Sequence, residues 1–243
     1  MKLSGKTAVV TGGGSGIGLA AAEALAIEGC RVVIAGRSQE RLRDAVAASK
    51  VPDYFLWRTV DVADRDRVEE LFSWATKGLG KIDILINAAG INVPKRSMAE
   101  MVPEDWDRIF QVNTTGSYNC MRAVLPEMLD RGDGLIINIS SIAGKRADQR
   151  GGVAYSASKF AQTALGLTVG AEVCDRDVRI TNIYPGETNT PILDERPVQL
   201  SDEHLANILQ PQDVAAAVVM VACLPSRARV PELVIVPTRQ AYM

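Results

Sequence analysis

Short runs of β-branched and aliphatic residues alternate along this chain with longer stretches whose apolar residues recur at helical spacing. Seven runs have the length and composition of strands, at residues 7–11, 31–35, 55–60, 82–87, 135–140, 179–184 and 233–236. The stretches between them predict helices at residues 17–28, 39–48, 64–77, 103–130, 154–174 and 211–224. The regular alternation of the two element types predicts an α/β protein.

Hydrophobicity is continuous rather than alternating within several predicted strands, as in Ile82-Asp-Ile-Leu-Ile86 and Leu135-Ile-Ile-Asn-Ile139. Strands of this kind are covered on both faces, as in a parallel sheet between two layers of helices. We therefore expect a doubly wound, seven-stranded, mainly parallel sheet flanked by helices on both faces. No Pro-, Gly- or Ser-rich stretch is long enough for a linker, which favours a single domain over residues 1–243.

Composition and charge narrow the class of protein. Hydrophobic residues make up 47% and charged residues 23% of the chain, which is typical of a globular protein with a full core. The formal net charge of -2, with both signs interspersed, offers no basic stripe, so no nucleic-acid partner is expected. The longest apolar run, residues 214–224, is shorter than the about 20 residues that cross a bilayer. With no apolar leader after Met1, we expect no membrane association and a cytoplasmic location.

Side chains that bind metals are sparse and scattered. Cys30, Cys120, Cys174 and Cys223 lie far apart without paired spacing, which argues against a zinc site or a disulfide framework. His204 is the only histidine. We therefore predict neither a metal site nor a Ser–His catalytic pair.

A glycine-rich turn, Thr11-Gly-Gly-Gly-Ser-Gly-Ile-Gly18, directly follows the first predicted strand and opens a predicted helix. Gly12, Gly16 and Gly18 would let the backbone turn tightly and place the helix N-terminus against a pyrophosphate, with Ser15 and Ile17 in the same turn. A glycine cluster alone is weak evidence, but strand, turn and helix occur here in the required order. The segment therefore predicts a dinucleotide site.

The end of the second predicted strand bears on the choice of cofactor. A carboxylate at this place binds the ribose 2′-hydroxyl of NAD, whereas an arginine pairs with the 2′-phosphate of NADP. The sequence has Gly36 followed by Arg37, which favours NADP(H) over NAD(H), although a solvated arginine at a helix start is the plainer alternative. Asp61, before Val62, is a candidate for the adenine edge or for a helix cap.

Tyr155 and Lys159 lie four residues apart on a predicted helix and therefore on one face. A neighbouring ammonium favours the phenolate, so we expect Lys159 to lower the pKa of Tyr155 toward the range useful in acid/base catalysis. An ordinary surface pair has the same spacing. Ser141 follows the fifth predicted strand, fourteen residues before Tyr155, and would reach the same crevice unless it only caps a turn.

Asn113 lies inside the long predicted helix 103–130, three residues before Gly116. A polar residue near glycine in a helix interior suggests a local deformation of the helix. The alternative is that the Asn113 side chain satisfies a buried backbone group.

These motifs, together with Asn87-Ala-Ala-Gly90 and Tyr184-Pro-Gly-Glu-Thr-Asn-Thr190, closely resemble those of the short-chain dehydrogenase/reductase family, over nearly the whole chain. The resemblance implies a Rossmann-type fold and a catalytic tetrad of Asn113, Ser141, Tyr155 and Lys159. It implies that Ser141 holds the substrate oxygen, Tyr155 exchanges its proton, and Lys159 binds the nicotinamide ribose and relays protons near Asn113. The cofactor contacts it implies are Gly12, Ser15, Gly16, Ile17, Gly18, Arg37, Asp61, Val62, Asn87, Ala88, Gly90, Tyr155, Lys159, Pro185, Gly186, Thr188 and Thr190.

The activity implied by the resemblance is hydride transfer between NADP(H) and a small-molecule alcohol or carbonyl substrate. Two alternatives stay open: an NAD(H)-dependent dehydrogenase of the same family, and a dinucleotide-binding sensor without chemistry, which has no need of an intact tetrad. Family members usually form homodimers or homotetramers through two long helices, here residues 103–130 and 154–174.

Substrate choice is expected to rest on three irregular segments, residues 91–97, 142–152 and 187–209. The last is charged and contains proline, as a lid or an ordinary solvated loop would be. Glu187 stands where the family often has a small or apolar residue. Lys145, Arg146 and Arg150 would attract an anionic substrate, or only form a solvated basic loop.

Overall fold

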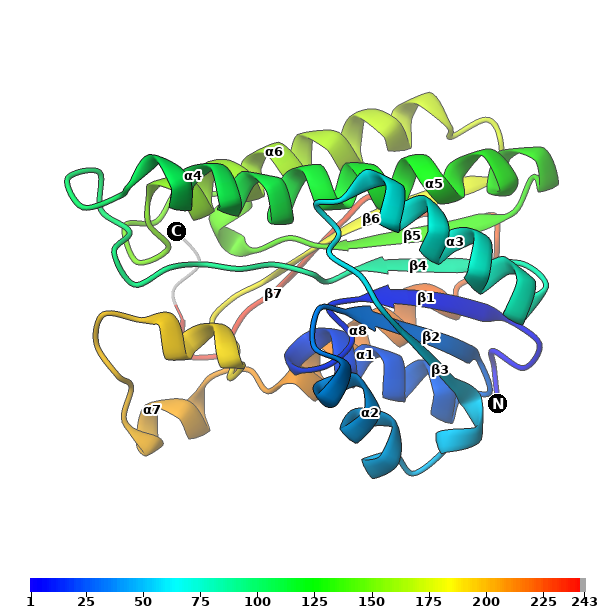
Figure 1. The fold of residues 1–243 in the computed structure, drawn as a ribbon, viewed down its shortest axis with the longest axis horizontal. Coiled ribbons are helices and arrows are strands. Elements are labelled where there is room, and N and C mark those ends of the chain that lie inside the picture. The colour runs from blue at the N-terminus through cyan, green and yellow to red at the C-terminus, as the bar shows by residue number, and fades with distance from the viewer. Residues whose placement is uncertain (241–243) are drawn as a thin grey trace.

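The computed structural model describes residues 1–240 and contains a seven-stranded sheet in the order β3-β2-β1-β4-β5-β6-β7 (Figure 1). Each neighbouring pair of strands is parallel, which confirms the predicted doubly wound architecture. The strands are β1 (Thr7–Thr11), β2 (Arg31–Gly36), β3 (Phe55–Thr59), β4 (Ile84–Asn87), β5 (Gly134–Ile139), β6 (Val178–Pro185) and β7 (Glu232–Ile235). Each lies within two residues of its predicted bounds.

Helices cover both faces of the sheet (Figure 1). One layer contains α1 (Gly16–Ile27), α2 (Gln39–Ala48) and α8 (Pro211–Ala222). The other contains α3 (Arg65–Leu79), α4 (Pro103–Phe110), α5 (Gly116–Arg131) and α6 (Val153–Glu172). The two cores are centred on side chains such as Leu25 and Val214 on one face and Leu71 and Met128 on the other, all fully buried. Each such side chain contributes about 1.5–3 kcal/mol through burial.

The predicted helix 103–130 is interrupted by a π-helical turn, Gln111–Thr115, between α4 and α5. Asn113 lies in this turn, and its side chain accepts from the Ile91 N–H (2.8 Å) and donates to the Ile91 carbonyl (3.1 Å). The helix widens where Asn113 turns inward to bind the segment that follows β4. The deformation expected near this residue is therefore confirmed, and so is its role in satisfying a buried backbone.

The segment between β6 and α8 holds two short helical elements that the apolar pattern did not predict. A 3₁₀ turn covers Pro191–Glu195, and α7 covers Asp202–Asn207 with the Ser201 hydroxyl accepting from the His204 N–H (3.2 Å). In Figure 1, α7 stands apart from the two helical layers, beyond the carboxyl ends of the strands. Among residues 1–240, no helix combines the length and the apolar character needed to cross a bilayer.

A row of buried asparagines joins β4, β5 and β6 beneath α6. Asn87 donates to Asn138 (3.0 Å), and Asn138 donates to Asn182 (3.1 Å) across strands in matching register. Gly166 of α6 packs directly on this row, since a Cβ there would lie 2.6 Å from Asn138 Nδ2. The row therefore sets how closely α6, the helix with Tyr155 and Lys159, approaches the sheet.

Candidate active site

The glycine turn after β1 forms a tight cradle against the end of β4. Gly12 has a φ of 67°, in the left-handed region, and a Cβ there would lie 2.8 Å from the Ala88 carbonyl group. A Cβ at Gly18 would collide with the Gly12 carbonyl. Ser15 precedes α1 without a capping bond from its side chain, so the first N–H groups of α1 are not satisfied by this cap, as suits a helix start that binds an anion. The cradle thus fits the pyrophosphate of a dinucleotide.

A groove of about 380 Å³ runs from this cradle across the carboxyl edge of the sheet. The predicted cofactor residues that line it are Gly12, Ser15, Gly16, Ile17, Gly18, Arg37, Asp61, Val62, Ala88, Gly90, Tyr155, Lys159 and Thr190. It is also lined by residues that no motif marked, among them Leu42, Val60, Ile91, Val112 and Ile192. Most of these residues are apolar, so they form a hydrophobic wall of the groove and have no polar motif that would mark them in the sequence.

Four predicted cofactor residues lie outside the groove. Asn87 is 1% exposed, its Nδ2 donates to the asparagine row, and its side chain does not line the groove. Pro185, Gly186 and Thr188 line the adjoining cavity instead.

Arg37 is exposed at the end of β2 and lines the groove with Ser38 and Arg41. Asp61 faces the same end, where its carboxylate binds the Arg108 guanidinium (2.7 Å) and the Ala63 N–H (3.0 Å). Partial burial opposes ionisation of Asp61, but these two partners hold its pKa below the ordinary value. Asp61 is therefore a charged, ion-paired group in the turn before α3. The expectation that it caps the helix is wrong, because the cap of α3 is Asp64, whose carboxylate accepts from the Arg67 N–H (3.1 Å).

Ser141 and Tyr155 meet where β5 ends and α6 begins. The Ser141 Oγ accepts from the Ala143 N–H (3.1 Å), so this serine also caps the 3₁₀ turn Ile142–Gly144. Tyr155 reaches the cavity with part of its surface, yet burial raises the pKa of its hydroxyl. The Ser141 hydroxyl, by hydrogen bonding, and the nearby charge of Arg96 act in the opposite direction on that pKa.

Lys159 is 3% exposed, and its Nζ donates to the Ile139 carbonyl (2.9 Å) and to Gln162 Oε1 (3.0 Å). The ammonium lies 5.8 Å from the centre of the Tyr155 ring. Burial lowers the pKa of Lys159 to about 7. The expected lowering of the Tyr155 pKa by Lys159 is therefore wrong for these residues: burial dominates both groups, and the ammonium is directed at other acceptors.

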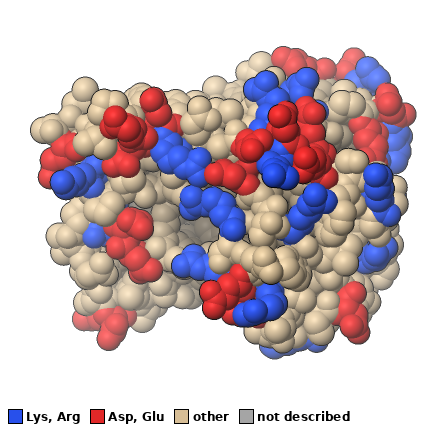
Figure 2. Space-filling view, in the orientation of Figure 1, with Lys and Arg blue, Asp and Glu red and all other residues tan. Residues whose placement is uncertain are grey.

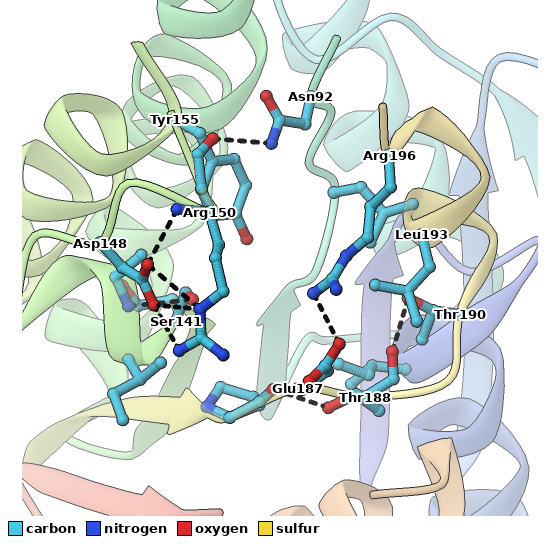
Figure 3. Close-up of a pocket in the computed structure, with 18 of the residues that line it drawn as sticks. Asn92, Ser141, Asp148, Arg150, Tyr155, Glu187, Thr188, Thr190, Leu193 and Arg196 are labelled. Atoms are coloured by element: carbon cyan, nitrogen blue, oxygen red, sulfur yellow. Dashed lines mark hydrogen bonds and ion pairs between the residues drawn. The ribbon is translucent and has the colours of Figure 1, made fainter. Parts of the chain in front are cut away.

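A small cavity of about 140 Å³ adjoins the groove (Figure 3). Tyr155, Ser141 and the Asp148–Arg150 ion pair (2.6 Å) lie on one side, and Arg196 and Glu187 face them from the other. Figure 2 shows the surface hollowed at this place, with Lys and Arg side chains beside the hollow. The cavity is small and rich in charge.

Glu187 connects both short elements of the following segment. Its side chain is 8% exposed, and its carboxylate contacts Arg196 Nη2 (2.7 Å) and His204 Nε2 (3.0 Å). The 187–209 segment is therefore attached to the cavity through Glu187, by an ion pair with Arg196 and a contact with His204.

Arg96 is the functional residue that sequence reasoning missed most clearly. It is 8% exposed and donates to the backbone carbonyls of Val93 (2.9 Å), Arg150 (3.1 Å) and Glu195. One side chain thereby joins all three segments expected to select the substrate. Its partners are carbonyl groups, which every residue has, so no sequence pattern could have marked it.

The arrangement can be compared with known proteins. A family model described as short chain dehydrogenase matches residues 6–200. A glycine betaine reductase from Emericella nidulans is 37% identical over 243 residues, and the match covers 97% of this chain but only 19% of that longer protein. An uncharacterized oxidoreductase from Staphylococcus saprophyticus is 35% identical over 98% of this chain and 99% of its own length.

Among solved structures, the closed form of a serine dehydrogenase complexed with NADP+ is similar throughout, with a TM-score of 0.88. It is 30% identical and the match covers 97% of this chain and 96% of that one. The similarity thus extends over almost the whole chain.

Proposed function

Because this chain belongs to the short-chain dehydrogenase/reductase family of oxidoreductases, we propose that it transfers a hydride between NADP(H) and a small alcohol or carbonyl compound. Enzymes of this family act on alcohol and ketone groups with a nicotinamide dinucleotide. The observation that carries the proposal is the place of Tyr155, which borders both the long groove and the small charged cavity. A cofactor in the groove and a substrate in the cavity would meet at its hydroxyl.

The proposed chemistry divides the work among the tetrad. In carbonyl reduction, the Ser141 and Tyr155 hydroxyls donate to the substrate oxygen and stabilise the negative charge that develops on it. Tyr155 then gives its proton to that oxygen as general acid. Lys159 would hold the nicotinamide ribose, and Asn113 fixes the backbone beside it through Ile91. The bound nicotinamide supplies the hydride and, when oxidised, a positive charge.

The preference for NADP(H) rests on the charges at the end of β2. Arg37 and Arg41 line the groove there, and Gly36 brings no carboxylate. Asp61, the carboxylate at this end of the groove, is already paired with Arg108 at 2.7 Å. A 2′-phosphate would therefore meet two arginines, whereas a free 2′-hydroxyl would lack the carboxylate that usually binds it.

We further propose that the substrate is small and polar and carries an anionic group. Arg96, Arg150 and Arg196 outnumber the carboxylates of Asp148 and Glu187 in the cavity lining by three to two, which leaves one positive charge in excess. An apolar substrate would have to cover these charges without pairing them, which is unfavourable. A hydroxy acid or the matching oxo acid supplies one negative charge near the reacting carbon. The similar serine dehydrogenase is named for a compound that also carries a hydroxyl group and a carboxylate, although with an ammonium group in addition.

Assembly into a homodimer or homotetramer is proposed from exposed apolar side chains on the helical layer of α4, α5 and α6. Trp106, Tyr118, Phe160 and Leu167 are 37%, 41%, 42% and 39% exposed. Apolar side chains gathered on long helices favour pairing of two copies. Light scattering of the purified protein tests this, and a monomer at micromolar concentration would contradict it.

The decisive experiment follows oxidation of NADPH and NADH by the purified protein with a panel of carbonyl compounds. The panel pairs oxo acids with their methyl esters and adds simple ketones, aldehydes and quinones. We expect turnover with NADPH, strongest with an oxo acid. Dinucleotide binding without turnover on any member would support the sensor alternative and contradict the proposal.

A further inference from the structure

The Lys159 ammonium is the first member of a buried chain of hydrogen bonds that runs between α6, α5 and the π-helical turn. Lys159 Nζ donates to Gln162 Oε1 (3.0 Å), Gln162 Nε2 donates to Ser117 Oγ (2.7 Å), and Ser117 Oγ donates to the Asn113 carbonyl (3.2 Å). Gln162 is 0% exposed and Ser117 is 3% exposed. Neither residue touches the groove or the small cavity.

The direction of each bond in this chain is determined by the next one. The Asn113 carbonyl can only accept, so the Ser117 hydroxyl uses its single proton there and has a lone pair left for Gln162. Gln162 must then turn its NH₂ group toward Ser117, which leaves its amide oxygen facing Lys159. The ammonium donates only, so the assignment is complete and consistent.

We propose that Gln162 and Ser117 are positioning residues that hold Lys159 in its catalytic place and keep it protonated. The proposal rests on the proposed role of Lys159 and adds two residues that the tetrad does not include. Its physical basis is the burial of a long cationic side chain, which is unfavourable unless acceptors compensate for the lost water. The Ile139 carbonyl is one acceptor and Gln162 is the side-chain acceptor.

The surroundings leave few other groups to perform this role. The end of β5, α6, the π-helical turn and the segment after β4 pack around the ammonium, and a Cβ at Gly90 would lie 3.6 Å from Lys159 Nζ. Tyr155 is the titratable side chain that these elements turn toward Lys159. Within residues 1–240, the structure contains no ion pair between Lys159 and a carboxylate. The protonation of Lys159 therefore depends strongly on the amide oxygen of Gln162.

The test compares pH profiles of kcat for Gln162→Leu and Gln162→Glu in the full-length protein. Loss of the acceptor in Gln162→Leu is expected to lower kcat about tenfold and to move the limb that reports loss of the Lys159 proton about one pH unit lower. A carboxylate in Gln162→Glu favours the ammonium and is expected to move the same limb upward. The KM for NADPH should change less than kcat in both variants.

Two further variants separate positioning from packing. Ser117→Ala frees the Gln162 amide to rotate, so its profile should shift in the direction of Gln162→Leu, and the double variant should be no worse than Gln162→Leu alone. Thr163→Val is the matched control, because it removes a buried hydroxyl from α6 that bonds Ser140 (3.1 Å) and not Lys159. It should lower stability without moving the profile.

If the pH profiles of Gln162→Leu and Gln162→Glu stay in place, or shift in the same direction, the proposed role of Gln162 and Ser117 is overturned. If Gln162→Leu does not fold, opposite shifts in Ser117→Ala and Gln162→Glu decide the matter in the same way. A wild-type protein without turnover on any carbonyl would refute the proposed function instead, so the two failures are distinguishable.

Discussion

Lys159 lies over the ring of Tyr155, with Nζ 5.8 Å from the ring centre, while its hydrogen bonds run to the Ile139 carbonyl and to Gln162. The two residues therefore interact through space and a shared helix face rather than by a direct hydrogen bond. Burial acts on them in opposite directions, raising the pKa of Tyr155 and lowering that of Lys159 to about 7. The pair is thus a phenol that keeps its proton beside a lysine whose charge depends on the acceptors around it.

Tyr155→Phe is expected to cut turnover by about a hundredfold or more, because a positioned general acid is lost. NADPH affinity, measured by fluorescence titration, should stay within about twofold of the wild-type value. This change is much smaller than the one that loss of a charged hydrogen bond to the cofactor would cause. Tyr54→Phe, distant from the cavity, serves as the control. Near-normal turnover in Tyr155→Phe would exclude Tyr155 as the acid.

Lys159→Met should abolish activity yet leave the protein at least as stable as the wild type near neutral pH. The folded pKa of about 7 lies below the ordinary value of 10.5, so the unfolded chain binds more protons between these two values. The unfolding free energy of the wild type should therefore rise with pH from 7 to 10 relative to the variant. Denaturant unfolding at pH 7 and pH 9 measures the unfolding free energies of both proteins, with Lys77→Met as an exposed control. If the variant's advantage in unfolding free energy over the wild type grows with pH, the lowered pKa of Lys159 is contradicted.

Arg37→Asp should shift the ratio of kcat/KM for NADPH over NADH by about tenfold or more toward NADH, since a charge-assisted bond to the phosphate is replaced by repulsion. Steady-state kinetics with both cofactors supply the ratio. Arg43→Asp changes an exposed arginine of α2 that is paired with Asp44 and lies outside the groove, so it should leave the ratio unchanged. An unchanged ratio in Arg37→Asp would remove Arg37 from phosphate recognition.

Arg196→Gln should lower kcat/KM for an oxo acid about tenfold, the effect of one lost charged hydrogen bond. The value for the matching methyl ester should hardly change, because the ester brings no charge to the cavity. Arg227→Gln, on the exposed surface, is the control. Equal losses for acid and ester would assign Arg196 to shaping the cavity through Glu187 instead of reading substrate charge.

Gly166→Ala should destabilise the protein by about 1–3 kcal/mol, as overpacking of a core does, although alanine favours helices. The added methyl would strike the Asn138 and Asn182 side chains. Gly170→Ala on the same helix is the comparison, since its Cβ would meet Ile180 Cβ at an ordinary 3.4 Å. Thermal unfolding of both variants gives the measurement. Equal midpoints would contradict the prediction and show that α6 can move away from the asparagine row at little cost.

Much of the fold was predictable because its signals are local. Continuous apolar runs marked each strand, and α2 has its predicted bounds, Gln39–Ala48, since Ser38 caps it and alanines fill it. The turn around Gly12 was predictable because backbone geometry demands glycine there. By contrast, α7 is a single polar helix of six residues whose position depends on His204 meeting Glu187, a contact between distant positions.

The site was predictable only where a motif names its residues. Ser141, Tyr155 and Lys159 lie together as expected, because their spacing follows strand ends and helix turns. Gln162 lies one helical turn after Lys159, but its other partner, Ser117, comes from α5. Arg196 has no motif, and its partner Glu187 lies nine positions earlier, just after β6. The direction of the Tyr155 pKa also depends on how densely the fold surrounds it, which is a property of packing and not of the pair.

The bonds of Arg96 have a consequence for how this enzyme can change over evolutionary time. Because they end on the carbonyls of Val93, Arg150 and Glu195, the residues at those positions can be exchanged without breaking them. Side chains around the mouth of the cavity are therefore free to diversify toward new substrates while the three segments keep their mutual arrangement. Substitution of Arg96 itself would break all three bonds at once, so this position is not free to vary in the same way.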